Sequence, residues 1–336
     1  MLSVICPIYN EEKYIAQCIE SLLLQDYPQN DLEILFVDGM STDKTREIIA
    51  TYTEKYPFIK MLDNPKKIVP YAMNAGIKAS KGDIIIRLDG HVEYPTNYFS
   101  ALVKNLKKLG ADNVGAICET LPCDETTKAL AIAEALSSSF GMGNSYFRIG
   151  CDKVKQVDTV PFGCFKREVF DKVGLYDNEL IRNQDDELNG RIVKNGGKIY
   201  LIPSIVTKYY ARDKISKVRK MFYQYGLYKP LVNKKLGAPA TIRQFFPLVF
   251  VLGLSFGAIL SCFSWIIAVM YLSVIILYLL LACYFTFKSV RKTGKMRLFV
   301  YQPLTYLTVH VSYGWGYLVG IYKILMHKPF NAESNR

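Results

Sequence analysis

The sequence predicts an α/β fold with a doubly wound, mostly parallel sheet, followed by a C-terminal helical region that spans a membrane. Short apolar runs rich in β-branched residues alternate with helical patterns over about the first 200 residues, which is typical of parallel sheets. The segment Gln244–Phe287 then contains 44 residues without one charged side chain. At about 1.5 Å per residue this is roughly twice the ~30 Å hydrocarbon thickness of a bilayer, so it predicts a helical hairpin.

The expected elements alternate from the first residues onward. Strands are expected at Leu2–Cys6, Glu33–Val37, Ile59–Leu62, Asp83–Leu88, Val114–Cys118, Val157–Phe162 and Lys198–Ile202. Helices are expected after Asn10 through Leu23, after Ser41 through Tyr52, and at Tyr71–Ala79, Asn97–Leu109, Glu125–Phe140, Lys166–Val173 and Asp185–Lys194. Asn10 and Ser41 suit N-cap positions because their side-chain oxygens can accept a first-turn N–H. The Gly-rich, polar stretch Gly141–Lys155 is expected to be a loop.

Composition divides the chain into five parts. They are an α/β domain over residues 1–207, basic interfacial helices over 208–243, a transmembrane hairpin over 244–287 with its turn near Ser261–Trp265, a basic cytoplasmic loop over 288–297, and a third transmembrane helix over 298–322. Two alternatives stay open. The first basic segment could be a solvated helix of the globular domain, and the last segment could be a buried soluble helix.

The charge distribution excludes some partners. The net charge is +12, but residues 198–336 carry 19 basic and two acidic side chains, whereas residues 1–197 carry 23 basic and 28 acidic ones. The acidic part would repel a phosphate backbone, so no nucleic acid partner is expected. The positive part fits membrane lipid headgroups. Five of the ten residues 288–297 are basic, which under the positive-inside rule places this segment, and with it the N-terminal domain, in the cytoplasm.

Polar residues gather where three expected strands end. Pro7–Glu11, Asp38–Asp43 and Asp89–His91 each follow a strand, and parallel sheets bind ligands at that edge. Asp89 and His91 could hold Mg²⁺ or Mn²⁺ against a diphosphate, because carboxylate oxygens suit both ions and an imidazole favours Mn²⁺. His91 could equally be a hydrogen-bonded loop residue.

A second acidic cluster, Asp185-Asp186-Glu187, begins an expected helix. It either complements the helix dipole or contains a general base. Other chemistries lack their sequence patterns: there is no Gly-x-Gly-x-x-Gly after a strand, no P-loop and no Gly-x-Ser-x-Gly. The eight cysteines show no Cys-x-x-Cys pair, so a zinc site is not expected.

The order of these motifs resembles a known family. The set is Val4-x-x-Pro7-x-Tyr9-Asn10-Glu11, Val37-Asp38-Gly39-x-Ser41-Thr42-Asp43, Asn74-Ala75-Gly76, Lys81-Gly82 with Leu88-Asp89-Gly90-His91, and Asp185-x-Glu187-Leu188. It resembles the inverting family 2 glycosyltransferases, whose nucleotide-sugar-binding domain is called GT-A. The resemblance covers about residues 1–230. Within the family the chain looks most like bacterial succinoglycan-type exopolysaccharide glucosyltransferases with a C-terminal membrane segment.

The resemblance implies a role for each matching residue. It makes Asp185 the catalytic base and Asp89 and His91 the ligands of a divalent metal, Mn²⁺ or Mg²⁺. It assigns nucleotide-sugar binding to Pro7, Tyr9, Glu11, Asp38, Asn74, Lys81 and Asp89, with Arg87 as a further diphosphate neighbour. It places Phe162, Gly163, Glu187 and Gln224 on the side of the acceptor and the leaving diphosphate.

The chain departs from the family pattern at several positions. Gly39 replaces the second Asp of the commoner Asp-Asp pair, His91 replaces the second metal-binding Asp, and Gln184 stands where a Glu usually precedes the catalytic Asp. Gln224-x-x-Leu227-Tyr228 lacks the Arg-Trp of processive synthases, which disfavours processive polymerisation.

The resemblance implies a cytoplasmic (inner) membrane enzyme with its catalytic domain facing the cytoplasm. It would move a sugar from a nucleotide-sugar, a UDP-sugar, to a polyprenyl-diphosphate-linked saccharide during exopolysaccharide or cell-surface glycan assembly. One alternative is a polyprenyl-phosphate sugar synthase. A non-enzymatic alternative is a membrane-anchored scaffold whose sugar-nucleotide site has decayed.

Overall fold

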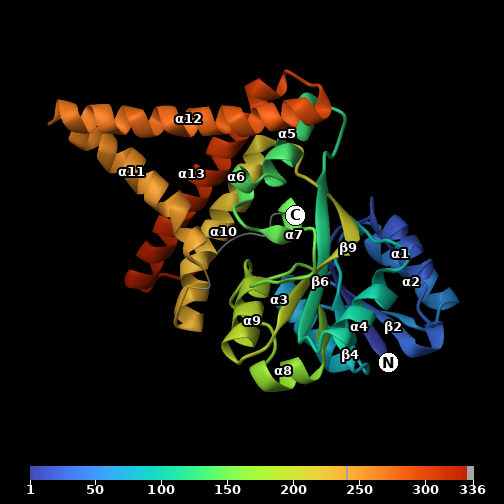
Figure 1. Cartoon of the computed structure of the whole chain (residues 1–336). Coiled ribbons are helices and arrows are strands. Elements are labelled where there is room, and N and C mark those ends of the chain that lie inside the picture. The colour runs from blue at the N-terminus through green and yellow to red at the C-terminus, as the bar shows by residue number, and fades with distance from the viewer. Residues whose placement is uncertain (240, 331–336) are drawn as a thin grey trace. The chain divides into compact units, whose positions relative to one another are not determined.

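The structure is a computed structural model that describes residues 1–239 and 241–330 (Figure 1). It consists of two compact units. The first contains Met1–Glu119 and Gly150–Tyr209, and the second contains Thr120–Ile149 and the described residues between Tyr210 and Phe330. Residues 120–149, which the sequence analysis placed inside the α/β domain, therefore group with the C-terminal helices.

The first unit is built on a mixed sheet with the strand order β3-β2-β1-β4-β8-β6-β9-β5, and β7 pairs with β9. The strands are β1 Leu2–Ile8, β2 Leu32–Asp38, β3 Ile59–Asp63, β4 Ile84–Arg87, β5 Val92–Glu93, β6 Asn113–Leu121, β7 Lys155–Gln156, β8 Cys164–Lys166 and β9 Ile199–Tyr210. Strands β1 to β4 pair in parallel, whereas β8 is antiparallel to β4 and β6. The predicted α/β class is confirmed. The three strands whose ends carry the predicted polar residues, β1, β2 and β4, all belong to the parallel half of the sheet.

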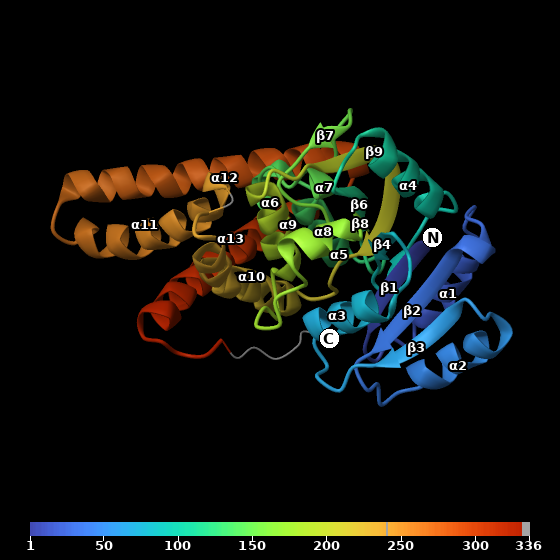
Figure 2. The ribbon, with the colours of Figure 1, turned by 90° about the horizontal axis from the view of Figure 1, so that it is seen from below.

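Helices cover this parallel half (Figure 2). The helices of the first unit are α1 Ile15–Leu23, α2 Thr45–Lys55, α3 Val69–Ala79, α4 Tyr98–Lys108, α8 Glu168–Val173 and α9 Gln184–Lys194. All seven residues of β1 and of β2 are buried, which explains their nearly continuous apolar sequence. Gly76 lets α3 approach the sheet, because a Cβ there would overlap the side chain of Ile5.

Several local predictions were wrong. Asn10 does not cap α1, which begins at Ile15, but has a positive φ of 54°. Ser41 does not cap α2, where Asp43 Oδ1 instead accepts from Thr45 N at 3.0 Å. The helix expected at 125–140 is broken at Ser137 and Ser138, and Val157–Phe162 forms no strand. Strand β8, only three residues long, was not predicted.

The second unit is helical. Its α-helices are α5 Thr127–Leu136, α6 Ser139–Met142, α7 Tyr146–Ile149, α10 Ile215–Leu236, α11 Phe246–Ser261, α12 Trp265–Thr293 and α13 Leu298–Leu325. The break between α11 and α12 falls where the hairpin turn was expected. Residues 288–293, expected to lie in a loop, instead continue α12, and the αL residue Gly294 (φ 72°) ends that helix.

Glycines bring the helices of this unit into backbone contact. A Cβ on Gly316 would overlap the carbonyl of Tyr223 in α10, and one on Gly314 would overlap the carbonyl of Pro247 in α11. Gly226 of α10 likewise faces the carbonyl of Tyr313. Such close approach through small residues lets the backbones of neighbouring helices pack directly against each other.

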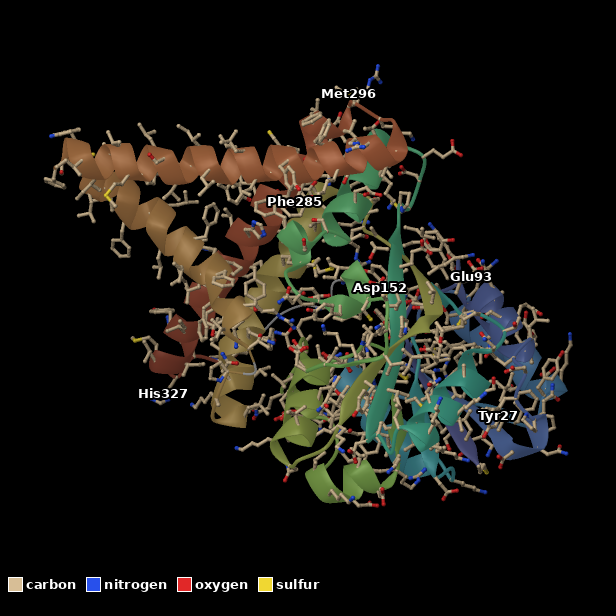
Figure 3. All side chains as sticks on the ribbon, in the orientation of Figure 1. Tyr27, Glu93, Asp152, Phe285, Met296 and His327 are labelled. Atoms are coloured by element: carbon tan, nitrogen blue, oxygen red, sulfur yellow. The ribbon has the colours of Figure 1, made fainter. Side chains whose placement is uncertain are left out.

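Among the described residues, two helical segments are long and apolar enough to cross a membrane. They are Ile242–Ser261 and Trp265–Thr293, and few of their residues are buried inside the protein. Figure 3 shows the side chains of α12 projecting outward along its length. Helix α13 differs because it has a buried stripe that includes Gln302 and Thr305. That α13 forms a third span therefore stays a prediction.

Candidate active site

Arg87 is the centre of the candidate site. It is the last residue of β4, follows three isoleucines and is 5% exposed. Its Nη1 donates to Asp185 Oδ1 at the start of α9, and its Nη2 lies 3.4 Å from Asp89 Oδ1. The end of a parallel strand thus joins the carboxylates that the sequence analysis predicted as base and metal ligand.

These charges shift one another's pKa values. Burial raises the pKa of Asp185 above its ordinary 3.8, and Asp89 and Asp186 add to this effect while the Arg87 guanidinium opposes it. Burial by itself would lower the pKa of Arg87, but the carboxylates of Asp185 and Asp89 outweigh burial and raise it. The Asp185 side chain is 29% exposed, so a substrate can reach it.

Asp89 and His91 follow Arg87 in the loop after β4. The backbone N–H of Asp89 donates to the Tyr94 hydroxyl at 2.8 Å, which fixes the loop. His91 Nδ1 lies 3.3 Å from Glu11 Oε1 but is buried without a hydrogen-bond partner. The loop therefore places an imidazole nitrogen between the end of β4 and the loop that follows β1.

The chemistry of these donors fits part of a metal site. Within residues 1–239 and 241–330, no group of three or more His, Cys, Asp or Glu side chains could hold a metal ion. Asp89 supplies a carboxylate, and His91 supplies a buried nitrogen that faces Glu11 but makes no hydrogen bond, so the two form a set of two ligands. Mg²⁺ typically keeps few protein ligands and takes the rest from substrate phosphates and water, so two are compatible with a nucleotide-bound ion.

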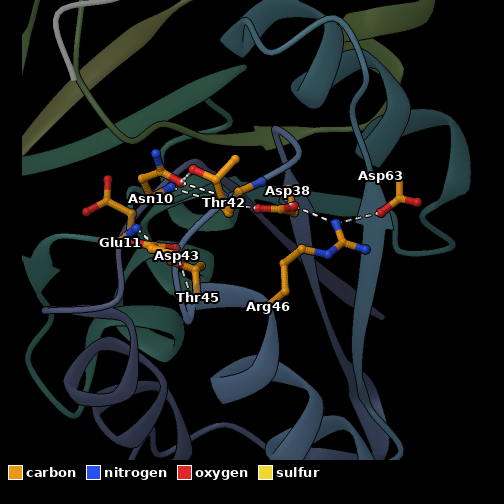
Figure 4. Close-up of polar contacts among 9 residues, drawn as sticks. Asn10, Glu11, Asp38, Thr42, Asp43, Thr45, Arg46 and Asp63 are labelled. Atoms are coloured by element: carbon orange, nitrogen blue, oxygen red, sulfur yellow. Dashed lines mark hydrogen bonds and ion pairs between the residues drawn. The ribbon is translucent and has the colours of Figure 1, made fainter.

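Asp38 ends β2 and is fully buried. Its carboxylate accepts from Ser41 Oγ at 2.5 Å, Ser41 N at 3.0 Å and Arg46 Nη1 at 2.5 Å (Figure 4). Arg46 also pairs with Asp63 at the end of β3, at 2.9 Å. The buried carboxylate is thereby paired and hydrogen-bonded, as such a group must be.

The loops after β1 and β2 are joined by hydrogen bonds (Figure 4). Asn10 N donates to Ser41 Oγ at 2.9 Å, and Thr42 N donates to Asn10 Oδ1 at 2.8 Å. Glu11 N donates to Thr45 Oγ1 at 2.8 Å. The polar residues that were predicted as helix caps instead fix two adjacent strand ends to each other.

Pro7 and Tyr9 lie on the same edge. Pro7 is a buried residue of β1, paired with Val37 of β2, and Tyr9 is partly exposed. Lys67 Nζ lies 5.9 Å from the centre of the Tyr9 ring. A Cβ on Gly39 would come within 3.3 Å of Tyr9 and of the Ile8 carbonyl, which accounts for the glycine at this position.

Two residues predicted to touch the substrate instead contact protein. The Asn74 amide bonds the backbone of Tyr176 in both directions, through Nδ2 to the carbonyl at 2.8 Å and Oδ1 from the N–H at 2.9 Å. The Glu187 carboxylate accepts from Arg191 Nε at 2.7 Å and Nη2 at 2.8 Å. Their polar atoms are engaged in holding the fold.

The backbone of Lys81 does not lie at this edge, so the structure adds no support to its predicted contact with the diphosphate. It precedes β4, and its backbone N–H donates to Glu33 Oε1 at 2.5 Å. The next residue, Gly82, donates to Ser3 Oγ at 2.8 Å. These partners lie near the amino ends of β1 and β2, at the opposite end of the parallel strands from Asp38 and Asp89.

Phe162 and Gly163 lie beside the end of β4. Arg87 N donates to the Gly163 carbonyl at 3.0 Å, and the Phe162 carbonyl accepts from Tyr98 OH at 3.3 Å. Gln224, also predicted on the acceptor side, is a buried residue of α10 in the second unit.

The sequence analysis missed the importance of Arg46 and Tyr176 and gave Arg87 only a minor place. One signal was available for Arg87, because a single charged residue in Ile84-Ile85-Ile86-Arg87-Leu88 must find a buried counter-charge. Tyr176 is 3% exposed and close enough to Arg87 and Asp185 for their charges to affect it. Nothing in the local sequence around Tyr176 indicates this proximity.

Similarity to known structures supports the GT-A class of fold. The chain is similar to a mannosyltransferase of Pyrobaculum calidifontis solved with GDP-Man and Mn²⁺, with a TM-score of 0.60, 17% identity, and 94% of this chain and 87% of the other covered. It is also similar to residues 1–349 of S. aureus TarS in complex with UDP-GlcNAc, with a TM-score of 0.54, 15% identity, and coverage of 98% and 93%.

Sequence similarity then defines the family. The family model described as Glycosyl transferase family 2 matches residues 3–174. Succinoglycan biosynthesis protein ExoA of Rhizobium meliloti (strain 1021) is 32% identical over 268 residues, with 79% of this chain and 80% of that protein covered. The chain belongs to glycosyltransferase family 2, and it is a glycosyltransferase.

A further relative matches almost end to end. It is the dolichyl N-acetyl-alpha-D-glucosaminyl phosphate 3-beta-D-2,3-diacetamido-2,3-dideoxy-beta-D-glucuronosyltransferase of Methanococcus voltae. It is 29% identical over 330 residues, with 96% of this chain and 97% of that protein covered. The similarity therefore extends beyond the α/β domain into the C-terminal helices.

Proposed function

We propose that this protein transfers one sugar, with inversion, from a UDP-sugar to a lipid-linked saccharide at the cytoplasmic face of a membrane. The observation that carries the proposal is the Arg87 guanidinium, which holds Asp185 beside Asp89 at the edge where β1, β2 and β4 end. The Asp185 carboxylate is suited to accept a proton. The Asp89 carboxylate lies at the carboxyl ends of the parallel strands, where such sheets bind their ligands.

Asp185 is the general base of the proposed reaction. It accepts the proton of the acceptor hydroxyl while that oxygen attacks the anomeric carbon from the face opposite the diphosphate. The bond between the anomeric carbon and the diphosphate oxygen breaks, and the electron pair leaves with the nucleotide. A raised pKa makes Asp185 a stronger base than an exposed aspartate, while Arg87 keeps one of its oxygens oriented.

The donor nucleotide lies over the ends of β1 and β2 in this proposal. Asp38 is fixed by Ser41 and Arg46 and is assigned to the uracil or ribose, with Pro7, Tyr9 and Glu11 lining the same pocket. Asp89 and His91 would hold a divalent metal, which when bound would supply positive charge beside the departing diphosphate. The names of two similar structures, which contain GDP-Man with Mn²⁺ and UDP-GlcNAc, support this part of the proposal.

The lipid-linked acceptor is supported by the relatives and by the helical unit. One relative of nearly equal length is named for a dolichyl-phosphate-linked sugar acceptor, and another for succinoglycan biosynthesis. The second unit has two helical segments long and apolar enough to hold the chain at a membrane. Phe162, Gly163 and Gln224 stay assigned to the acceptor and diphosphate side. A single addition per acceptor is expected, because the Arg-Trp of processive synthases is absent after Gln224.

A second candidate changes only the acceptor. The Methanococcus voltae relative is named for a sugar carried on a dolichyl monophosphate, so the bridge between lipid and sugar could be one phosphate or two. Transfer onto bare polyprenyl phosphate is the remaining enzymatic alternative.

The test is an acceptor and donor screen with the purified full-length protein in detergent. UDP- and GDP-sugars are combined with Mn²⁺ and with polyprenyl phosphate, polyprenyl-phosphate-sugar or polyprenyl-diphosphate-sugar, and nucleotide release and lipid products are measured. The proposal expects one added sugar of inverted anomeric configuration on a lipid-linked saccharide. Product only on bare polyprenyl phosphate would support the alternative, and release of no nucleotide with any acceptor would support a scaffold.

A further inference from the structure

The connection between α8 and α9, residues 174–183, leads directly to the proposed base. Asp185 is the second residue of α9, so the position of this connection determines where its carboxylate lies. The connection begins with Gly174 at φ 82° and ends with Asn183 at φ 60°, and it contains no regular element. Side chains from α3 and from α9 itself hold its backbone.

From α3, Asn74 holds Tyr176 through two backbone hydrogen bonds. Its Nδ2 donates to the Tyr176 carbonyl at 2.8 Å, and its Oδ1 accepts from the Tyr176 N–H at 2.9 Å. Only an amide side chain offers a donor and an acceptor in this geometry. Asn74 is 8% exposed, so water cannot take the place of Tyr176 as its partner. Loss of either hydrogen bond would therefore leave a buried polar group unpaired, which costs free energy.

From α9, Arg191 holds the residues just before Tyr176. Its guanidinium donates to the carbonyls of Val173, Gly174 and Leu175, the last at 2.7 Å. Glu187 fixes the guanidinium in turn through two hydrogen bonds, and its side chain is 4% exposed. Four successive residues, 173–176, are therefore fixed to α3 and α9 by side chains.

The residue that these contacts fix lies against the charged centre. Tyr176 is 3% exposed and lies close enough to Arg87 and Asp185 for both charges to act on its phenol. Burial raises the pKa of its phenol, with Asp185 adding to the effect and Arg87 opposing it, as expected for a ring beside that ion pair. A displacement of Tyr176 would therefore change the space around Arg87 and Asp185.

We propose that Asn74 and Arg191 are positioning residues. They hold the 173–176 backbone, and through it they keep Tyr176 and Asp185 in place against Arg87 of β4. This inference rests on the proposed function, in which Asp185 is the base. It gives Asn74 and Glu187 a different role from substrate contact. Asn74 connects α3, which packs beside the parallel strands, to the segment that leads to Asp185.

The test compares Asn74→Asp and Asn74→Ala with the control Asn178→Ala in the full-length protein. Asn74→Asp keeps the acceptor for Tyr176 N–H but loses the donor to its carbonyl. Asn178 is exposed, and its Oδ1 accepts a hydrogen bond from Asn74 Nδ2 at 3.0 Å, so its removal leaves both bonds between Asn74 and Tyr176 available. Steady-state kinetics give kcat and its pH profile, and calorimetry gives the Kd for UDP with Mn²⁺.

For both Asn74 variants we expect kcat to fall about 10- to 100-fold, the scale of a misplacement of about 1 Å, with the Kd for UDP within about twofold. We also expect a displaced acid limb of the kcat profile and wild-type behaviour for Asn178→Ala. A weakened Kd for UDP at unchanged kcat would overturn the inference and make Asn74 a donor ligand.

If the Asn74 variants fail to fold, Arg191→Lys tests the same claim. A lysine keeps the charge beside Glu187, but its three N–H donors cannot replace the five hydrogen bonds that the Arg191 guanidinium makes to Glu187 and to three carbonyls. Loss of kcat at constant UDP affinity is expected, and unchanged kcat would overturn the inference. The variant Asp185→Asn separates failure of the proposed function from failure of this inference. Near-normal turnover in that variant would overturn the assignment of Asp185 as the base, whatever the Asn74 result.

Discussion

Arg87, the last residue of β4, donates a hydrogen bond to Asp185 in the first turn of α9, and the two side chains form a largely buried ion pair. The same guanidinium faces Asp89 at 3.4 Å. One positive charge thus sits between the proposed base and the carboxylate assigned to the metal. This arrangement makes the ionisation of Asp185 dependent on Arg87.

Replacing Arg87 should move the acid limb of the pH profile of kcat/KM. Activity requires ionised Asp185, so activity is lost as pH falls through its pKa. Arg87 lowers that pKa against the effect of burial, so Arg87→Met should raise it and shift the acid limb to higher pH. Arg87→Lys keeps the charge and should shift the limb less. An acid limb at the same pH in Arg87→Met would contradict the ion-pair account.

Replacing Arg46 should destabilise the protein more than replacing its second partner. Arg46→Met leaves the Asp38 carboxylate, which is fully buried, with only its bonds to Ser41, and should cost about 3 kcal/mol of unfolding free energy. Asp63 is 57% exposed, and Asp63→Asn should cost less than about 1 kcal/mol. Denaturant unfolding of the full chain in detergent measures both. Equal losses would show that the buried pair is not the dominant one.

Helix packing in the second unit should fail at a specific glycine. Gly316→Ala places a methyl group against the Tyr223 carbonyl of α10, which should cost about 1–3 kcal/mol. Gly253 of α11 has no atom within 4 Å of the corresponding position, so Gly253→Ala is a matched control. Thermal unfolding in detergent should show a lower midpoint only for Gly316→Ala. Two equal midpoints would contradict backbone contact between α10 and α13.

Metal removal should abolish transfer, and the His91 variant should need more metal. Chelation removes the charge that neutralises the leaving diphosphate, so activity should vanish with EDTA and return with Mn²⁺. His91→Ala removes one of two protein ligands and should raise the half-saturating Mn²⁺ concentration about tenfold or more. Transfer that persists in EDTA, or an unchanged Mn²⁺ requirement in His91→Ala, would remove the metal assignment from this loop.

The parallel half of the sheet could be predicted because its strands are long, buried and separated by helical patterns, as in Leu2–Ile8 and Leu32–Asp38. The antiparallel half could be predicted only in part, because β6 and β9 were expected as strands but β5, β7 and β8 have only two or three residues each. Such short segments carry no periodicity, and their pairing depends on distant residues. The same limit applies to 120–149, whose place among the C-terminal helices comes from tertiary packing.

The candidate site was predictable where a strand end determines position. Asp38 and Asp89 follow strands that are neighbours of β1, so their common edge follows from strand order. Lys81 precedes β4, so its backbone lies at the end of the strand opposite to Asp89. The partners of Asn74 and Glu187, which are Tyr176 and Arg191, could be recognised only from the folded structure.

The central claim is that Asp185 removes the proton from the acceptor hydroxyl. The most direct measurement compares wild type with Asp185→Asn, using single-turnover transfer from the UDP-sugar to the lipid-linked acceptor and calorimetric UDP-sugar binding with Mn²⁺. An amide cannot accept that proton, so the account predicts a rate loss of about 10²–10⁴-fold with donor binding still measurable. Near-normal turnover by Asp185→Asn would contradict it.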